Sequence, residues 1–555
     1  MDEKFWHKSY APGVQKTLNY EKITISEALS RAAKNFPQHT ALNYMGKRIT
    51  YQALDGLVNQ FARALQDLDD KPGDKVAVCL PNIPQVIIAN MAIFRVGAAT
   101  VQNNPLYTER ELAYQLNDSD SKHVITLTLL VPRMQKIKPE TQLQKIIGCH
   151  INTYLPFPKK QLFPLVKKDM YRKVEPGGDI LVFKDVIGKY SADPLPDQSK
   201  WDELGALLYT GGTTGVSKGV MLSHANLSSN VQQFVAWFPD LKPGEERLVG
   251  NFPVFHIAGF TAIQNMITWQ GWENIMVPRP EPKINVEIIK KYKPTFLPAV
   301  PTIFVGLLAD SEFRRLDFSS LKGFFSGAAP LAADTIRDLK ELTGATMCEV
   351  YGSTETAPVA TVTPWGGTIK PGTAGVPVPD TDVKIVDIAD PNKILDVGET
   401  GEIAVKGPQI MVGYYKKPEE TENALKDGWF FTGDIGKFDE DGYLAIVDRT
   451  KDMIIAGGYN IYPVELDDVL MGHDKILEAC TIGLPHEYRG ETVKAFIVTK
   501  EGETLTEEEV TRYCKENLAA YKVPKIIEFI DELPKSAVGK VLRRKLKEME
   551  LEKMK

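Results

Sequence analysis

The sequence of 555 residues is 43% hydrophobic and 25% charged, with a net charge of −6 at pH 7. A chain of this length exceeds what one hydrophobic core supports, so we expect a globular protein of several lobes. The acidic balance argues against a general nucleic-acid-binding protein, which needs a basic face to replace the counterions of phosphate groups.

Neither secretion nor a membrane span is indicated. The start, MDEKFWHKSY, carries acidic residues where a signal peptide needs basic ones. The longest apolar stretch, 77–101, is interrupted by polar residues that a spanning helix does not tolerate. The five cysteines form no CxxC pair, so we expect reduced thiols rather than a zinc site or a disulfide framework. A cytoplasmic protein is therefore expected.

The first part of the chain alternates helical and strand patterns. Apolar residues recur at helical spacing between Thr50 and Leu68, and Thr50 is placed as the N-cap. A strand is expected at Lys75 to Leu80, a helix at Pro84 to Val96 and a strand at Ala98 to Gln102. Such alternation predicts right-handed crossovers and a mainly parallel sheet.

The segment from Tyr154 to Tyr171 interleaves leucine, phenylalanine and proline with lysine. Basic and aromatic residues together suit an anionic bilayer surface, which suggests peripheral membrane contact at the inner face of a membrane. The prolines argue against a regular amphipathic helix. An exposed loop that packs its aromatic residues on the body of the protein explains the segment equally well.

The stretch from Tyr209 to Gly219, YTGGTTGVSKG, follows the apolar run 206–208. Glycines let backbone N–H groups approach a polyphosphate closely, and the threonines and the lysine add further donors. The loop is not a Walker A motif, because Ser217 precedes Lys218 and Gly219 follows it. A nucleoside triphosphate is therefore expected here, without a P-loop kinase or ATPase.

The alternation of strands and helices recurs between Val286 and Val350, and the pattern changes after Pro371. Strands separated by Gly, Pro and Asp turns suggest a β-rich subdomain that ends near Val447. Beyond residue 451 we expect a small α+β domain with strands at 494–498 and 525–530 and a helix opened by a capping box at 506–509.

The glycine-rich stretch resembles the signature loop of the adenylate-forming acyl-CoA synthetase superfamily, which usually reads YTSGTTGxPKG. Further motifs of this superfamily follow in the expected order along nearly the whole chain. The Gly-Gly variant is similar to that of the long-chain fatty-acid–CoA ligases, and Ser217 departs from the frequent proline. The other motifs are FPVFHIAG around His256, VPT at Val300–Thr302, VYGSTE at Val350–Glu355, TGD at Thr432–Asp434, DRTKD at Asp448–Asp452 and PKSAVGK at Pro534–Lys540.

The resemblance implies an α/β fold in two parts. A large N-terminal adenylation domain at 1–447 has mainly parallel sheets, flanking helices and a β-rich subdomain. A hinge follows at 448–451 with its pivot at Lys451, and a small mobile α+β lid domain covers 452–555. Rotation about the hinge would let one site serve two successive reactions.

The resemblance also implies an ATP and AMP site. Glu355 would hold Mg²⁺, a chemically sufficient arrangement because Mg²⁺ uses one or two carboxylates together with phosphates. Thr354 would contact the α-phosphate, Tyr351 would lie against adenine, and Asp434 with Arg449 would bind the ribose. For Arg449 alone, a surface ion pair with Asp448 or Asp452 is the simpler explanation. The remaining residues implied are Thr210, Gly211, Gly212, Thr213, Thr214, Gly215, Lys218, Gly327, Ala328, Ala329, Gly352 and Ser353.

The resemblance also assigns residues to the carboxylic acid and to coenzyme A. His256 resembles a residue near the carboxylate, although a lone histidine in an apolar segment is more often a core residue. An acyl pocket is implied at Phe255, His256, Gly259, Val300 and Gly327, and a channel for coenzyme A at Gly457, Gly458 and Tyr459. Lys540 would swing onto the α-phosphate during adenylation; otherwise it is a solvated member of the basic run at 540–547.

The expected activity is that of a ligase that joins a medium- or long-chain fatty acid to coenzyme A through acyl-AMP, with ATP and Mg²⁺. A ligase for an aryl or alicyclic acid, or one that loads a carrier protein, stays open, because the pocket depth cannot be ranked from the sequence. A non-catalytic nucleotide- or acyl-binding regulator is disfavoured by the presence of Glu355 and Lys540. The expected partners are these small molecules, a second copy of the chain in a homodimer, and no nucleic acid.

Overall fold

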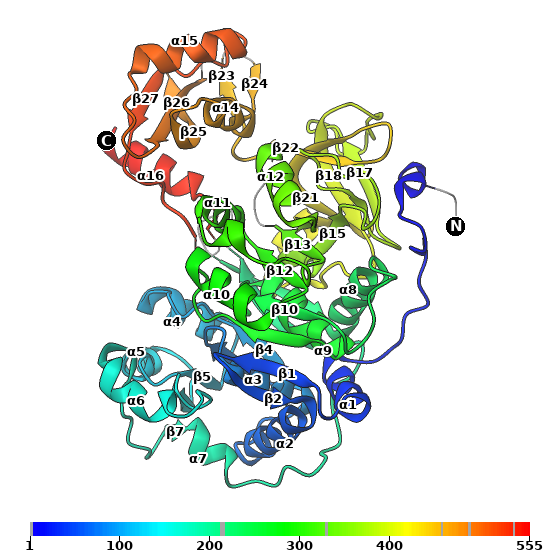
Figure 1. The fold of residues 1–555 in the computed structure, drawn as a ribbon, viewed down its shortest axis with the longest axis vertical. Helices are drawn as coiled ribbons and strands as arrows, with labels where there is room; N and C mark the ends of the chain where they lie inside the picture. Colours follow the sequence, from blue (N-terminus) through cyan, green and yellow to red (C-terminus); the bar gives the residue numbers. More distant parts are fainter. Residues whose placement is uncertain are drawn as a thin grey trace. The chain divides into compact units, whose positions relative to one another are not determined.

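A computed structural model describes residues 4–210, 217–327, 331–456, 459–486, 490–536 and 539–554. The chain divides into two compact units (Figure 1): 1–382 with 405–430, and 383–404 with 431–555. The predicted α/β fold with mainly parallel sheets is confirmed. In this division residues 383–404 and 431–447 group with the C-terminal part, and the adenylation and lid domains at 1–447 and 452–555 stay predictions. The hinge at 448–451 stays a prediction.

The first unit contains a nine-stranded sheet that is parallel from β1 to β14 and has antiparallel edges. Its strands, in spatial order, are β16 (Val376–Pro377), β15 (Val359–Val362), β14 (Thr346–Gly352), β13 (Gly323–Ser326), β12 (Phe296–Ala299), β10 (Arg247–Gly250), β11 (Glu273–Met276), β1 (Thr40–Tyr44) and β2 (Lys47–Thr50).

A second sheet of the first unit has eight strands, which run parallel from β8 to β7. β9 is antiparallel to β8, so the glycine-rich loop connects two neighbouring antiparallel strands. In spatial order the strands are β19 (Gly413–Tyr414), β9 (Lys218–Ser223), β8 (Leu204–Thr210), β4 (Ala99–Gln102), β3 (Lys75–Cys79), β5 (His123–Leu127), β6 (Lys145–Cys149) and β7 (Ile180–Val182).

Helices flank both sheets (Figure 1), and their apolar sides supply the core. α3 buries every one of its residues. The helices of this unit are η1 (Phe5–Ser9), α1 (Ile25–Asn35), α2 (Tyr51–Asp67), α3 (Pro84–Arg95), α4 (Glu109–Asp118), α5 (Val131–Ile137), η2 (Lys138–Glu140), α6 (Lys159–Val166), η3 (Lys168–Met170), α7 (Phe183–Ile187), α8 (His224–Ala236), η4 (Gly259–Asn265), α9 (Met266–Gln270), α10 (Pro282–Tyr292), α11 (Pro301–Ala309), η5 (Phe313–Arg315), α12 (Ala333–Thr343), η6 (Thr354–Thr356) and α13 (Pro418–Ala424).

The remaining strands form two five-stranded sheets. The first has the order β17 (Asp382–Val386), β18 (Gly401–Lys406), β21 (Trp429–Phe438) and β20 (Leu425–Lys426), with β22 (Leu444–Arg449) also paired to β21. The second has the order β24 (Tyr459–Ile461), β23 (Ile454–Ala456), β26 (Gly490–Thr499) and β25 (Ile476–His486), with β27 (Ile526–Phe529) paired to β26. Helices α14 (Pro463–Met471), α15 (Glu507–Asn517) and α16 (Arg543–Lys553) complete the second unit.

The local predictions agree closely with these elements. Thr50 caps α2 by accepting a hydrogen bond from the Ala53 N–H at 3.2 Å, and Thr506 caps α15 in a capping box with Glu509. β3, α3 and β4 lie where they were expected, as do the alternating elements from α10 to β14. β26 is longer than expected, because β25 pairs along its whole length.

The expectation that residues 154–171 form no regular helix is wrong, because α6 spans eight of them. Pro158 precedes the helix, where no N–H donor is needed. Pro164 lies inside the helix and removes one backbone donor, and the Lys160 carbonyl, four residues earlier, accepts a hydrogen bond from the Asn152 side-chain amide at 2.9 Å. Tyr154 and Leu155 pack on the body, and Tyr171 stacks on His150 with ring centroids 5.0 Å apart. α6 itself buries none of its residues.

All five cysteines are unpaired and buried, as expected. Burial raises the pKa of each thiol, to about 12 for Cys79, about 12 for Cys480 and about 11 for Cys514. In the part of the chain that the structure describes, no helix is long and apolar enough to span a bilayer.

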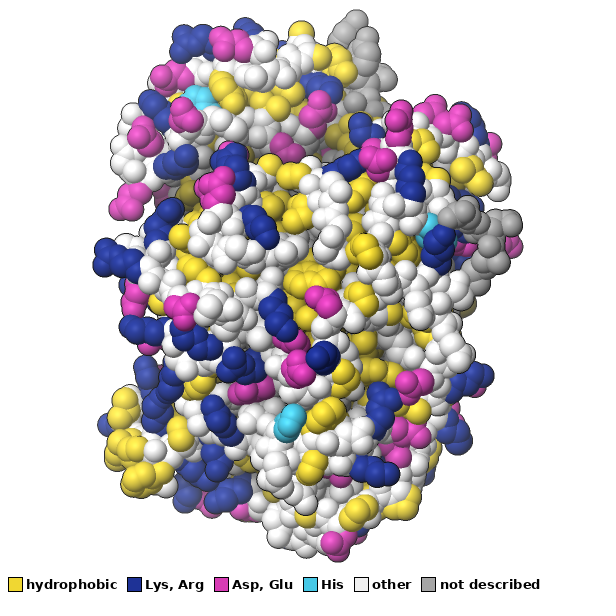
Figure 2. Space-filling model, turned by 45° about the vertical axis from the view of Figure 1, so that its right-hand side comes forward, with side chains coloured by type: hydrophobic (Ala, Val, Ile, Leu, Met, Phe, Trp, Pro, Cys, Tyr) yellow, Lys and Arg dark blue, Asp and Glu magenta, His cyan; other side chains and the backbone are white. Residues whose placement is uncertain are grey.

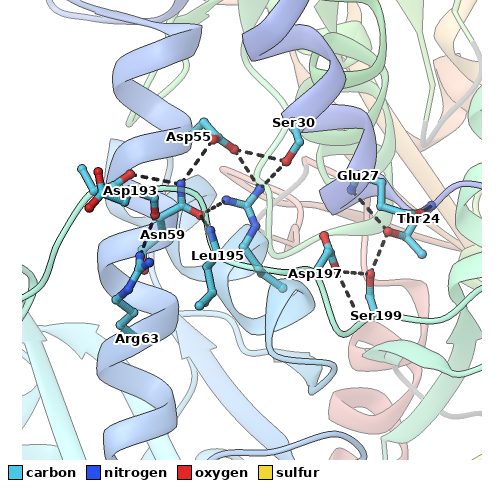
Figure 3. A network of polar contacts seen from close by, with 12 residues as sticks. Thr24, Glu27, Ser30, Asp55, Asn59, Arg63, Asp193, Leu195, Asp197 and Ser199 are labelled. Carbon is cyan, nitrogen blue, oxygen red and sulfur yellow. Dashed lines mark hydrogen bonds and ion pairs between the residues drawn. The ribbon is translucent and has the colours of Figure 1, made fainter.

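A buried arginine fixes the segment that leads into β8 (Figure 3). The side chain of Arg95 is 1% exposed, and its guanidinium donates hydrogen bonds to Ser30, Asp55 and Asn59 at 2.6–2.9 Å. Asn59 in turn accepts the N–H of Leu195 at 3.2 Å and donates to the carbonyl of residue 192. The network therefore joins α1, α2 and α3 to residues 191–199, ahead of the strand that carries the glycine-rich loop.

We expect replacement of Arg95 by Met to lower the free energy of unfolding by about 3–5 kcal/mol, because it leaves the Asp55 carboxylate without its buried partner. Arg63 is the matched control, since it donates to backbone carbonyls of the same segment from a partly exposed position. Urea denaturation of both variants measures the difference. If both variants lost the same free energy of unfolding, the buried Arg95–Asp55 pair would contribute no more to stability than the contacts of Arg63.

Candidate functional site

The carboxyl ends of parallel strands in the nine-stranded sheet bring several predicted residues to one edge. Val300 follows β12, Gly327 follows β13, and residues 353–355 follow β14. His256 lies six residues beyond the end of β10, which is parallel to β12. Parallel strands end at the same edge of their sheet, which is where open α/β sheets bind ligands. The structure thus gathers segments that are far apart in the sequence.

A tight turn presents Thr354 and Glu355 beyond β14. The Ser353 N–H donates to Thr356 Oγ1 at 2.8 Å, and the Met411 N–H donates to the Glu355 carbonyl at 2.8 Å. Gly352 is required here, because a Cβ would lie 1.7 Å from the Pro358 carbonyl oxygen. Tyr351, Thr354 and Glu355 are each half-buried, so their side chains remain accessible to a ligand.

The segment around His256 is built against this turn. Thr261 donates a hydrogen bond to the Ala357 carbonyl at 2.7 Å, which ties η4 to the end of η6. Gly259 is required, because a Cβ would lie 2.1 Å from the Pro253 carbonyl oxygen. Asn82, beyond the end of β3, donates to the carbonyls of Gly250 and Phe252. His256 and Phe255 are half-buried rather than sealed in the core.

The glycine-rich loop is held at both of its ends. Thr210 and Lys218 pair across β8 and β9, and residues 211–216 lie outside the described residues. The Tyr209 hydroxyl donates to Asp118 at 2.8 Å, and the Tyr114 hydroxyl donates to the Ser217 carbonyl at 3.0 Å. α4 therefore supports the base of the loop.

The sequence analysis missed Tyr414. Its hydroxyl donates to Glu355 Oε1 at 2.9 Å, and Lys218 Nζ lies 4.9 Å from the centroid of its ring. Burial, and then the Glu355 carboxylate, raise the pKa of Tyr414, so the phenol is a stable donor. Because β19 has only two residues, no periodic pattern pointed to it; the one signal was an aromatic pair after Gly413.

A second group of predicted residues lies in the second unit. Asp434 and Arg449 are opposite each other across β21 and β22, with Arg449 Nε 2.9 Å from Asp434 Oδ1. Arg449 therefore forms an ion pair with Asp434, and the role of both residues at the ribose stays a prediction. Asp448 accepts the backbone N–H groups of Arg449 and Val464, which fixes the start of α14.

Lys540 belongs to the same group. Next to it Gly539 has a φ of +73°, and the Ser536 N–H donates a hydrogen bond to the Lys540 carbonyl at 2.8 Å. Lys540 is an exposed residue, yet the protein atoms around its ammonium reduce its contact with water, which lowers the pKa of Lys540 to about 8. The Arg449 guanidinium adds to this shift, and the carboxylates of Asp434 and Asp452 oppose it.

The other predicted residues are placed as follows. Among the residues that the structure describes, a Cβ at Gly327 would meet the Val350 carbonyl oxygen at 3.6 Å, an ordinary van der Waals distance. Lys451 lies in the turn between β22 and β23, and Tyr459 begins β24. Ala328, Ala329, Gly457 and Gly458 lie outside the described residues, as do Gly211, Gly212, Thr213, Thr214 and Gly215.

Within the described ranges, no group of three or more His, Cys, Asp or Glu side chains converges as a preformed metal centre. Glu355 is a single carboxylate beside a threonine, which offers oxygen ligands only. This donor set fits a hard cation such as Mg²⁺, Ca²⁺ or Mn²⁺ that takes its other ligands from phosphates and water, rather than a soft metal ion that prefers sulfur ligands.

Comparison with known proteins agrees with this geometry. Residues 29–415 match the family described as AMP-binding enzyme, and residues 465–540 match the AMP-binding enzyme C-terminal domain. Two similar proteins are long-chain-fatty-acid–CoA ligases. That of Bacillus subtilis (strain 168) is 42% identical over 99% of both chains, and that of Yersinia pestis is 38% identical over 99% of this chain and 98% of its own.

Among solved structures, the ATP-bound MatB from Rhodopseudomonas palustris is similar, with a TM-score of 0.83 and 29% identity over 96% of this chain and all of that chain. The two family matches follow one another along the chain in the order of the predicted motifs. The chain therefore belongs to the AMP-binding enzyme family of adenylate-forming enzymes.

Proposed function

We propose that this chain is an AMP-forming ligase that joins a medium- or long-chain fatty acid to coenzyme A. The observation that carries the proposal is the 42% identity to a long-chain-fatty-acid–CoA ligase over 99% of both chains. The acid would attack the α-phosphate of ATP to give acyl-AMP and pyrophosphate, and the thiol of coenzyme A would then displace AMP to give the thioester.

In the first step the chain must bind a crowded polyphosphate. Thr210 and Lys218, with the loop between them, would hold the β- and γ-phosphates, because an ammonium and hydroxyl groups complement their charge. Thr354 would donate to the α-phosphate from the turn beyond β14. His256 and Phe255 would border the carboxylate at the mouth of an acyl pocket that continues past Val300 and Gly327.

Glu355 is the residue that would hold Mg²⁺, whose charge would offset that of the phosphates when it is bound. Asp434 would accept hydrogen bonds from the ribose hydroxyls, and Arg449 at 2.9 Å would orient that carboxylate. Lys540 would supply positive charge at the α-phosphate as the acid attacks.

Thioester formation, the second step, needs the thiol of coenzyme A at the place where adenylation, the first step, needs the positive charge of Lys540. Rotation of residues 452–555 about Lys451 would exchange Lys540 for the segment around Gly457, Gly458 and Tyr459, which would line the channel for coenzyme A. These assignments, and the boundaries of the adenylation and lid domains, follow from the family resemblance.

An aryl or alicyclic acid, or transfer to a carrier protein, remains the alternative within the same fold. Pyrophosphate release across a panel of acids of increasing chain length and of aryl acids, with and without coenzyme A, separates these activities. We expect the highest kcat/KM for medium or long chains and a thioester only with coenzyme A. A preference for benzoate-like acids, or no pyrophosphate with any acid, would overturn the proposed function.

Lys540 gives the two steps different pH dependences. As the pH rises through about 8, the lysine loses its proton, so kcat/KM for pyrophosphate release should fall above pH 8 in the free enzyme. Lys540→Arg stays charged and should remove this decline. Lys540→Ala should slow adenylation by roughly 10²- to 10³-fold and spare thioester formation from supplied acyl-AMP. Equal loss of both steps in Lys540→Ala would refute the role.

Peripheral contact with an anionic membrane, through residues 154–171, is a further part of the proposal. Phe157, Leu165 and Val166 are 82%, 67% and 69% exposed. Lys159, Lys167 and Lys168 are exposed beside them. Figure 2 shows hydrophobic side chains gathered near Lys and Arg at the lower left, where Figure 1 places α6. Apolar side chains that enter the interface and lysines that meet anionic headgroups suit a surface that collects a lipidic acid.

Co-sedimentation with neutral vesicles and with vesicles containing anionic phospholipid tests this contact. We expect binding to anionic vesicles that weakens with salt and falls roughly fivefold for each of Lys167→Gln and Lys168→Gln, about 1 kcal/mol per lysine. Leu165→Ser should weaken it as well, whereas Val305→Ser, at a side chain 48% exposed on α11, should not. No binding, or equal effects of Leu165→Ser and Val305→Ser, would exclude this surface. Homodimer formation stays a prediction from the resemblance.

A further inference from the structure

Residues 411–415 connect the two segments that carry Lys218 and Glu355. The Val412 N–H donates to the Met221 carbonyl at 2.9 Å, and the Tyr415 N–H donates to the Gly219 carbonyl at 2.8 Å, so the segment extends the eight-stranded sheet beyond β9. At its other side the Met411 N–H donates to the Glu355 carbonyl at 2.8 Å. The backbone alone therefore fixes the distance between β9 and η6.

The side chain of Tyr414 adds a contact to each segment. Its hydroxyl donates to Glu355 Oε1 at 2.9 Å, and the face of its ring lies 4.9 Å from Lys218 Nζ. Tyr414 is 9% exposed, so its position is determined by packing rather than by solvent. One aromatic side chain thus orients a carboxylate and an ammonium of opposite charge.

The two contacts differ in what they leave free. A carboxylate has about four acceptor positions, so one phenol hydrogen bond at Oε1 fixes its rotation and leaves Oε2 for another ligand. An aromatic face attracts an ammonium without neutralising its charge, so Lys218 keeps its charge for an anion. A direct ion pair of Lys218 with Glu355 would have used both groups.

We propose that Tyr414 is a positioning residue that holds Glu355 for the cation and Lys218 for the phosphates of ATP. The inference rests on the proposed function for the identity of these ligands. It does not require that the acid be a fatty acid, because Tyr414 acts on the nucleotide side of the reaction.

Tyr415, the residue directly after β19, provides a matched control. Its hydroxyl donates to Asp120 at 2.9 Å, and Lys416 also pairs with Asp120 at 2.8 Å. Tyr415→Phe therefore removes a phenol–carboxylate hydrogen bond of the same length at a carboxylate with no proposed role. If loss of a phenol hydrogen bond merely weakened the segment 411–415, ATP binding should change equally in Tyr414→Phe and Tyr415→Phe.

Calorimetric titration of the full chain with ATP, once with Mg²⁺ and once with EDTA, tests the proposal without requiring turnover. Tyr414→Phe keeps the ring and loses the hydroxyl, so the Kd for ATP should rise about tenfold with Mg²⁺ and less than twofold with EDTA. Tyr414→Leu also loses the ring and should weaken ATP binding in both conditions. Tyr415→Phe should change neither.

A double-mutant cycle with Glu355→Gln completes the test. Because Tyr414 acts through Glu355, Tyr414→Phe should add little in the Glu355→Gln background. Unchanged binding in Tyr414→Phe, the same loss in Tyr415→Phe, or an equal loss with and without Mg²⁺ would overturn the proposal. If no acid yields pyrophosphate but the Mg²⁺-dependent loss in Tyr414→Phe persists, the proposed function fails and this inference stands.

Discussion

The candidate site depends on one constraint, which is that parallel strands all end at the same edge of their sheet. β10, β12, β13 and β14 are separated by helices in the sequence, but their carboxyl ends are neighbours in the nine-stranded sheet. A residue just beyond any of these strands is therefore brought near the others without a dedicated contact. The polar turn at 353–355 and the histidine segment use this edge, and Thr261 with Asn82 fixes their approach.

The local features of this arrangement could be predicted from the sequence. The capping threonines at residues 50 and 506, the apolar strand before the glycine-rich loop and the strand–helix alternation all depend on neighbours within a few residues. The site residues were assigned through the resemblance of their motifs to those of adenylate-forming enzymes, and several of these motifs contain a glycine that a tight turn needs. Gly352 and Gly259 show the reason, since backbone atoms occupy the place of a Cβ.

The rest depended on contacts between distant segments, which no local pattern records. Tyr414 meets Glu355 and Lys218 only because β19 pairs with β9. The prolines at 158 and 164 misled the prediction for α6, because Pro158 lies at the N-cap and the Lys160 carbonyl, which loses its donor to Pro164, accepts a hydrogen bond from Asn152 instead. The grouping of residues 383–404 with the C-terminal part likewise reflects packing rather than sequence order.

The burial of all five cysteines has a chemical consequence. On the proposed function, the protein creates a mixed anhydride in its own interior, and that compound acylates any thiolate it meets. A thiol whose pKa is raised to about 11 or 12 is almost wholly protonated at neutral pH, and a buried one is also out of reach. The chain therefore offers its activated intermediate no sulfur nucleophile of its own, which leaves an incoming cofactor thiol without an internal competitor.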